Sequence, residues 1–266
     1  MKGKRTLAIL FSGIAGFVLF LLVWWWIAYA LQKSGNYALP TPWFTIKTAA
    51  IYLFASGASV TWKAIGWSGL RVVIGLGAGF LLGGILGILS GLFKASESFF
   101  KTLVSVSRAV PTAAIVILLI TIFTKPNLWD KQTYLPCVLV FLVVFPLVYE
   151  AFVSGIRAVP KEEKEAIRLD TKLANPNSVF GILIPDSRDF IVLSLIQSLG
   201  LSVKVCVMSE ILISSSAVDK GLGNMIANAR LNGPVEDIIV YAWISLLLVL
   251  AFDIPLGILK RKLKKQ

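Results

Sequence analysis

The chain has 266 residues, of which 57% are hydrophobic and 15% charged, and its mean hydropathy of +0.82 is too high for a soluble domain. Its formal net charge of +12 is typical, in a membrane protein, of cytoplasmic loops and contact with anionic lipid, and no basic stripe with interleaved aromatic residues indicates nucleic acid as a partner. The sequence has no histidine, and its two cysteines show no metal spacing, so we expect no metal site and no histidine proton relay, and most hydrolytic triads are excluded.

Long apolar runs predict membrane-spanning helices rather than barrel strands. The first run is longer than the roughly 7–15 residues of a signal-peptide core, so we expect an uncleaved anchor helix, although Ala28-Tyr29-Ala30 resembles a cleavage site. The sequence predicts an all-α membrane protein with one domain over residues 1–266. Its six expected spans are residues 7–31, 68–93, 110–123, 134–156, 191–213 and 238–259.

The connections between the first four spans differ in character. Leu39-Pro40-Thr41-Pro42 predicts a stiff turn, because each proline fixes its own φ and restricts the residue before it. Residues 43–55 suit a short helix on the outer surface. Residues 94–108 read as a short basic connection, and Pro111 near the start of the short third span suggests a broken or tilted helix.

Glycines recur at every fourth position along the second span. Small residues at this spacing form a stripe on which another helix can approach backbone to backbone. The alternative is a membrane helix that merely tolerates glycine. We expect tight helix packing at Gly75, Gly79, Gly83 and Gly87, with Gly91 continuing the stripe.

The distribution of basic residues predicts the orientation. With the N-terminus inside, seventeen Lys and Arg residues fall on inner segments and seven on outer segments. Because cytoplasmic loops carry the excess of basic residues, both termini are predicted to be cytoplasmic.

A polar segment, residues 157–189, interrupts the apolar chain and holds six of its fourteen acidic residues. In the predicted orientation it is cytoplasmic, and its mixed charge suggests a docking surface. A helix that begins after Pro160 would carry Glu162, Glu163 and Glu165 near its positive end, which stabilises it.

Charged residues within spans are candidates for function, because burying them in lipid is costly. For Arg71 and Asp253, toward span ends, snorkelling or lipid contact is the simpler interpretation. We expect Lys204, Ser209 and Glu210 to belong to a translocation path, with Lys204 either lining it for an anionic solute or forming a structural ion pair. Glu210 lies nearer the outer end, where a gate or structural role suits it better than anion binding.

The sequence has no phosphate-binding loop of the G-x-x-x-x-G-K-[ST] type, and Gly221-Leu222-Gly223 is too short to bind a dinucleotide. If ATP energises transport, the ATPase is therefore another chain. No cofactor is expected on this one.

Several motifs together resemble the permease subunit of bacterial ABC importers of the nitrate, sulfonate, taurine and bicarbonate group, over nearly the whole chain. They are the turn at residues 39–42, Ser68 with Arg71 and Gly75, Pro111 to Ala114, Phe145-Pro146 with Gly155, Lys204 with Glu210, and the run Gly221 to Ala229. The cytoplasmic Glu-Ala-Ala…Gly…Leu-Pro signature of that family looks like Glu165 to Asp170 with Ile184-Pro185, although Asp170 or Thr171 stands at the glycine position.

The resemblance implies a type I importer permease in the bacterial inner membrane, not itself an enzyme. It implies two ATPase subunits that bind ATP and Mg²⁺, a second permease copy, an extracytoplasmic solute-binding protein and surrounding lipid as partners. ATPase coupling would fall to Glu162, Glu165, Ala166, Arg168, Leu169, Asp170 and Pro185. The solute would be a small anion such as a sulfonate or nitrate, or a small heterocyclic nutrient.

Two other classes remain open on the sequence alone. A secondary transporter driven by an ion gradient would need carboxylates at the membrane midplane and inverted repeats, and neither is clear. A membrane enzyme such as a lipid transferase would need an acid/base cluster, whereas the carboxylates within spans occur singly.

Overall fold

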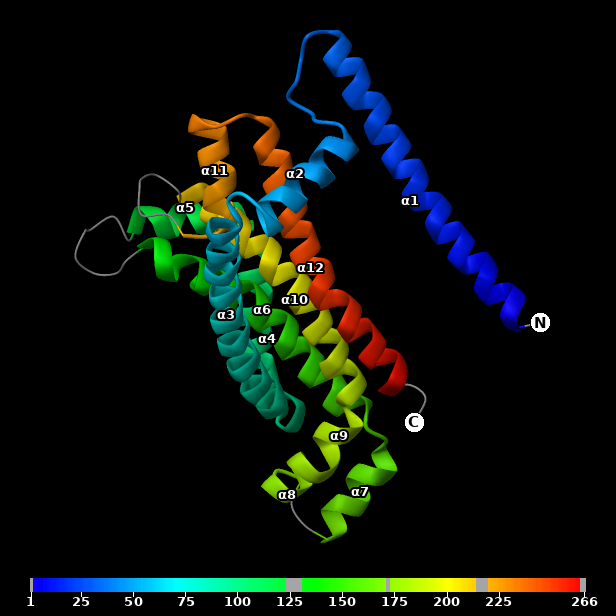
Figure 1. Ribbon diagram of the computed structural model, residues 1–266. Coiled ribbons are helices and arrows are strands. Elements are labelled where there is room, and N and C mark those ends of the chain that lie inside the picture. The colour runs from blue at the N-terminus through cyan, green and yellow to red at the C-terminus, as the bar shows by residue number, and fades with distance from the viewer. Residues whose placement is uncertain (1, 123–130, 171–172, 214–219, 264–266) are drawn as a thin grey trace. The chain divides into compact units, whose positions relative to one another are not determined.

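The apolar runs fold into helices, and every regular element among the described residues is helical. The computed structural model describes residues 2–122, 131–170, 173–213 and 220–263 (Figure 1). The helices are α1 (Lys2–Lys33), α2 (Pro42–Phe54), α3 (Ala58–Leu92), α4 (Lys94–Ala109), α5 (Thr112–Ile122), α6 (Lys131–Ala158), α7 (Lys161–Asp170), α8 (Pro176–Ser178), the π-helical turn η1 (Val179–Leu183), α9 (Ile184–Asp186), α10 (Arg188–Ile213), α11 (Leu222–Asn232) and α12 (Glu236–Leu263).

The chain divides into two compact units. One comprises Met1–Trp62 with Met225–Ile244, and the other Lys63–Asn224 with Ser245–Gln266. The prediction of a single domain over residues 1–266 stays a prediction.

In the first unit, the proline-rich turn sets the start of α2. The Thr41 side chain accepts a hydrogen bond from the Phe44 backbone N–H at 3.4 Å, and Pro42 occupies the first turn, where its missing N–H costs nothing. The Trp24 indole donates to the Pro40 carbonyl at 3.1 Å, which ties α1 to this turn. The helix expected over residues 43–55 is therefore present as α2.

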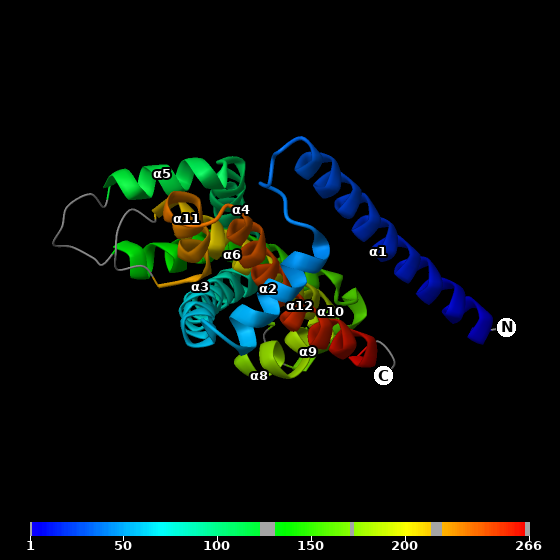
Figure 2. The same ribbon diagram turned by 45° about the horizontal axis from the view of Figure 1, so that its top comes forward.

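In the second unit, α6 has close neighbours on two sides. The stripe of glycines on α3 lies against it, so that a methyl group built on Gly75 would come within 2.6 Å of the Cys137 carbonyl oxygen, and one on Gly87 within 2.6 Å of the Phe152 Cβ. Helix α10 also packs along α6 and runs alongside it in both views (Figures 1 and 2). Replacing these glycines would push α3 away from α6.

The prediction of a simple basic connection over residues 94–108 was wrong, because this stretch is helix α4. Its apolar residues recur at helical spacing, and Val104 is buried against Phe145 and Tyr149 of α6. Pro111 lacks an N–H and leaves Val110 extended (φ −80°, ψ 126°), so α4 ends at Ala109. Figure 2 shows α5 leaving α4 at a sharp angle, and the pair bends by 90°.

Four helices among the described residues are long and apolar enough to cross a membrane, or five if the bent pair α4–α5 is one span. The four are residues Phe11–Lys33, Ala58–Leu92, Tyr134–Ala158 and Arg188–Ile213. The second begins ten residues before the predicted start at Ser68. The sixth predicted span, residues 238–259, lies within helix α12, and the total of six stays a prediction.

Candidate functional site

The polar segment 157–189 folds into a set of short helices whose apolar side is anchored. Helix α7 begins directly after Pro160, with Glu162 and Glu163 in its first turn, where the positive end of the helix dipole favours acidic residues. Ile167 of α7 is buried, and with Val159, Val179 and Leu183 it forms an apolar cluster. Ile88 and Leu92 of α3 pack against this cluster. The segment is therefore held on the end of a membrane-spanning helix.

The opposite side of this segment is exposed. Leu169 has 91% of its surface exposed, on a helix otherwise rich in charge. Asp170 ends α7, and its side chain lies outside the described residues. The other residues predicted to couple to an ATPase are all exposed: Glu162, Glu165, Ala166, Arg168 and Pro185.

Two carboxyl groups meet between α7 and α9. A hydrogen bond with Asp186 raises the pKa of Glu163, with loss of hydration and the nearby negative charges adding to the effect. The contact brings α9 to the first turn of α7. Neither Glu163 nor Asp186 was among the predicted coupling residues, since only their closeness in space gives them a shared role.

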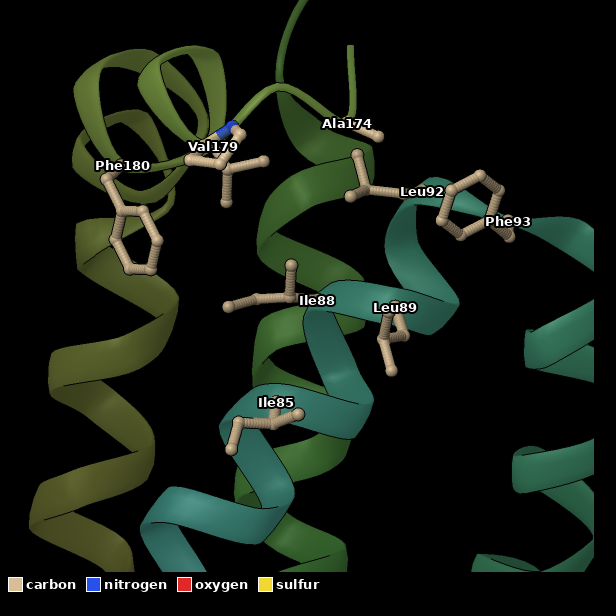
Figure 3. Close-up of a pocket in the computed structure, with 9 residues that line it drawn as sticks. Ile85, Ile88, Leu89, Leu92, Phe93, Ala174, Val179 and Phe180 are labelled. Carbon is tan, nitrogen blue, oxygen red and sulfur yellow. The ribbon is translucent and has the colours of Figure 1, made fainter.

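An apolar groove of about 280 Å³ separates α3 from the residues that follow α7. Figure 3 shows Ile88 and Leu92 of α3 on one side of the groove and Val179 and Phe180 on the other. Its lining is apolar throughout, so it offers no polar contact for a charged solute. The groove lies at the edge of the apolar cluster that anchors the polar segment, with which it shares Ile88, Leu92 and Val179.

A buried polar network surrounds Glu210 near the end of α10. The Arg71 Nη1 donates to Glu210 Oε1 at 2.5 Å, the Ser68 hydroxyl donates to Oε2 at 2.8 Å, and the Gly223 N–H donates to Oε2 at 2.9 Å. Arg71 and Glu210 are each 2% exposed. The Cys206 thiol also donates to Oε1, at 3.6 Å, so this carboxylate is surrounded by hydrogen-bond donors, as a buried charge requires.

The same network fixes the backbone that leads into α11. Arg71 also donates to the Lys220 carbonyl at 2.5 Å, and the Leu222 N–H donates to the Ser68 hydroxyl at 2.9 Å. Gly221 has φ +146°, and a methyl group there would lie 2.5 Å from the Glu210 carboxyl carbon. Only glycine meets both conditions, which explains the residue at position 221.

The snorkelling interpretation of Arg71 was wrong. Its side chain points into the protein because the Glu210 carboxyl group lies there. The two residues are 139 positions apart, so no local sequence pattern relates them. One signal was present: Ser68 and Arg71 lie three residues apart, on one face of α3.

The three residues predicted for the translocation path do not come together. Ser209 is buried and donates to the Cys206 carbonyl of its own helix at 2.7 Å, and Glu210 is held in the network. Lys204 is exposed on another face of α10. The four predicted packing glycines all lie against α6.

Comparison with known proteins identifies the family of this chain. Residues 79–265 match the family of binding-protein-dependent transport system inner membrane components. The chain belongs to this family. The family and the inner-membrane location expected from the sequence are confirmed. The chain is a transmembrane, non-catalytic permease component of ABC transport, and such a system implies ATPase and binding-protein partners.

This permease is also similar to a Bacillus subtilis (strain 168) protein described as an aliphatic sulfonates transport permease protein, SsuC. The two are 29% identical over 245 residues, which cover 91% of this chain and 82% of the relative. The family match includes the whole polar segment and Glu210, whereas the Ser68 and Arg71 partners of the network precede it.

Proposed function

We propose that this permease forms the translocation path of an ATP-driven importer for a small organic anion of the sulfonate type. The observation that carries the proposal is the family match over residues 79–265, which contains the entire polar segment and the α10 span. The relative described as an aliphatic sulfonates permease supports the choice of solute, since its similarity extends over 91% of this chain.

In this proposal the polar segment is the coupling surface for the ATPase. Its exposed side combines charged residues of both signs with the apolar side chain of Leu169, and both are available to contact a partner protein. Its buried side packs against the end of α3 at Ile88 and Leu92. Rigid movement of an attached ATPase would therefore pull on a membrane span directly.

The working assembly would contain two permease copies, two ATPase subunits that bind ATP and Mg²⁺, and one binding protein outside. Each copy would cross the membrane six times, with α4–α5 as a bent span and α12 as the last, and both termini would be cytoplasmic. The excess of basic residues on the inner segments supports this orientation.

Lys204 is the residue we assign to the solute path. It is exposed within a 26-residue span that is apolar enough to cross the membrane, and an ammonium group there compensates an anion. Ser209 and Glu210 are committed to contacts within the chain, so in this proposal they hold the outer end of α10 rather than bind solute.

The coupling assignment is tested by capturing the ATPase encoded beside this chain with detergent-solubilised permease. Glu165→Arg reverses an exposed charge on α7 and should reduce capture at least tenfold. The matched control, Glu236→Arg at the start of α12, lies on the predicted outer side and should leave capture unchanged. Equal capture by Glu165→Arg and wild type would remove α7 from the interface, and no capture by wild type would favour a transporter driven by an ion gradient.

A further inference from the structure

Helix α10 has two faces of opposite character. One face is buried and carries a small or polar residue at every fourth position: Ser194, Ser198, Ser202, Cys206 and Glu210. The other face is exposed and carries Leu193, Gln197, Lys204, Met208 and Leu212. The exposed face is therefore the one in contact with lipid, water or a ligand.

Two polar side chains lie deep along that exposed face. Lys204 is nine residues before the end of α10 at Ile213, and Gln197 nine residues after its start at Arg188. At 1.5 Å per residue, each lies roughly 13 Å from the nearer end of the helix. Lysines near span ends can extend to the membrane surface, but these two positions are near the middle.

The outward face of α3 provides the contrast within the same unit. Its exposed residues through the corresponding length are apolar, and they suit contact with lipid: Val73, Ile74, Leu81, Leu82 and Ile85. On α10, neither Gln197 nor Lys204 has a hydrogen-bond or ion-pair partner among the described residues. An amide and an ammonium group without partners would be costly against lipid, so this face requires water or a polar ligand.

We propose that the outward face of α10 is a water-lined strip of the solute path, on which Gln197 is a second solute-contacting residue. This inference rests on the proposed function and deepens it. The two residues are seven positions apart, roughly 10 Å along the axis and two turns on the same face, so a small solute meets them in succession. In the predicted orientation, Lys204 is met first.

The chemistry of the strip defines the ligand class. The Lys204 ammonium supplies positive charge and three donors, and the Gln197 amide supplies N–H donors to the oxygens of an anionic head group. Leu193 and Met208, on the same face, offer apolar contact to a short hydrocarbon tail. The strip therefore suits a small oxyanion with an apolar tail, which is the chemistry of an aliphatic sulfonate.

Cysteine labelling tests whether the strip is in water, without needing the solute. In a background of Cys137→Ser and Cys206→Ser, single substitutions Gln197→Cys and Met208→Cys are compared with Ile74→Cys on the lipid-facing side of α3. Anionic and cationic water-soluble methanethiosulfonates are applied to the assembled transporter in lipid nanodiscs. We expect the two α10 positions to react at least tenfold faster than Ile74→Cys, and the anionic reagent to be favoured there until Lys204→Met removes the preference.

Labelling no faster than at Ile74→Cys would overturn the proposal, because the strip would then face lipid. Disulfide formation between two copies at Gln197→Cys or Met208→Cys would also overturn it, since a second permease would cover the face.

Uptake measurements then test solute contact. In proteoliposomes with the ATPase and binding protein, Gln197→Leu should reduce butanesulfonate uptake at least fivefold, with ATP hydrolysis stimulated by the loaded binding protein as in wild type. Gln197→Asn, which keeps the amide, should retain more uptake than Gln197→Leu. If wild type imports butanesulfonate and Gln197→Leu imports it equally well, the role of Gln197 is overturned. Rapid labelling without any wild-type sulfonate import would instead contradict the proposed solute and leave the water-lined strip standing.

Discussion

Arg71 and Glu210, 139 positions apart in the sequence, form a buried ion pair with 2.5 Å between Nη1 and Oε1. The pair joins α3 to α10, and through the Lys220 carbonyl and the Gly223 N–H it also holds the chain that enters α11. A buried ion pair is weak support for stability by itself, but it specifies which surfaces meet.

Removing one partner of this pair should be far more damaging than removing both. Arg71→Met leaves a buried carboxylate without its cation, and we expect a loss of about 3–5 kcal/mol in unfolding free energy. The double variant Arg71→Met with Glu210→Gln removes both charges and should recover most of that loss. Thermal unfolding of the purified variants measures the coupling. If the two substitutions simply add, the residues do not act as a pair.

Helix α3 should tolerate a side chain at a glycine outside the stripe but not at one within it. A Cβ on Gly87 would lie 2.6 Å from the Phe152 Cβ, whereas nothing lies within 4 Å of a Cβ on Gly77. We therefore expect Gly87→Val to cost about 1–3 kcal/mol through overpacking. Gly77→Val is the matched control on the same helix and should melt near wild type. Similar melting temperatures for both variants would contradict close packing of α3 on α6.

Tyr52 of α2 should contribute a pH-dependent contact in the first unit. Its hydroxyl donates to both Asp237 carboxylate oxygens at 3.0 Å, and burial, followed by this hydrogen bond, raises the pKa of Tyr52 to about 12. Because the folded state favours the neutral phenol, the contribution is present below pH 10 and is lost as the pH rises through 12.

Tyr52→Phe should therefore lower stability by about 1 kcal/mol at pH 7, the size of one net hydrogen bond. The difference from wild type should shrink between pH 10 and 12. Denaturant unfolding at several pH values measures it, with Tyr37→Phe, an exposed tyrosine in the same unit, as the control. A difference that grows with alkalinity would contradict the assigned direction.

The Glu163 and Asp186 contact predicts a small gain in stability when Glu163 is replaced, whereas replacing Tyr52 causes a loss. Since the pKa of Glu163 is raised, its ionised form is disfavoured in the folded chain, and stability falls as the pH rises through that pKa. Glu163→Gln should thus raise the melting temperature at pH 8 by about 1 °C, the scale of one exposed like-charge contact. At pH 4 the gain should disappear. A loss of stability at pH 8 would show that the two carboxyl groups do not oppose each other.

Features carried by local chemistry could be predicted from the sequence. The membrane class, the α2 helix after its proline turn, the start of α7 after Pro160 and the family itself follow from composition, capping residues and short motifs. Helix α4 was missed because its basic residues suggested a connection, whereas its apolar side finds burial only once Phe145 and Tyr149 of α6 lie beside it.

The partners of charged residues could not be predicted in the same way. Arg71 and Glu210 are joined by tertiary structure, and no local pattern relates them. The same holds for the two faces of α10, whose mean apolar character conceals that Lys204 is exposed and Glu210 buried. The neighbouring helices determine which residues of a span can contact solute and which make structural contacts within the chain.

In the function we propose, this permease imports a sulfonate-type anion when ATP is hydrolysed by a partner bound at the polar segment. The most direct measurement is uptake of labelled butanesulfonate by proteoliposomes that contain permease, ATPase and binding protein, with ATP or without it. We predict uptake only with ATP and binding protein together, and at least a tenfold reduction with Glu165→Arg. Uptake that follows an ion gradient without ATP would contradict the account.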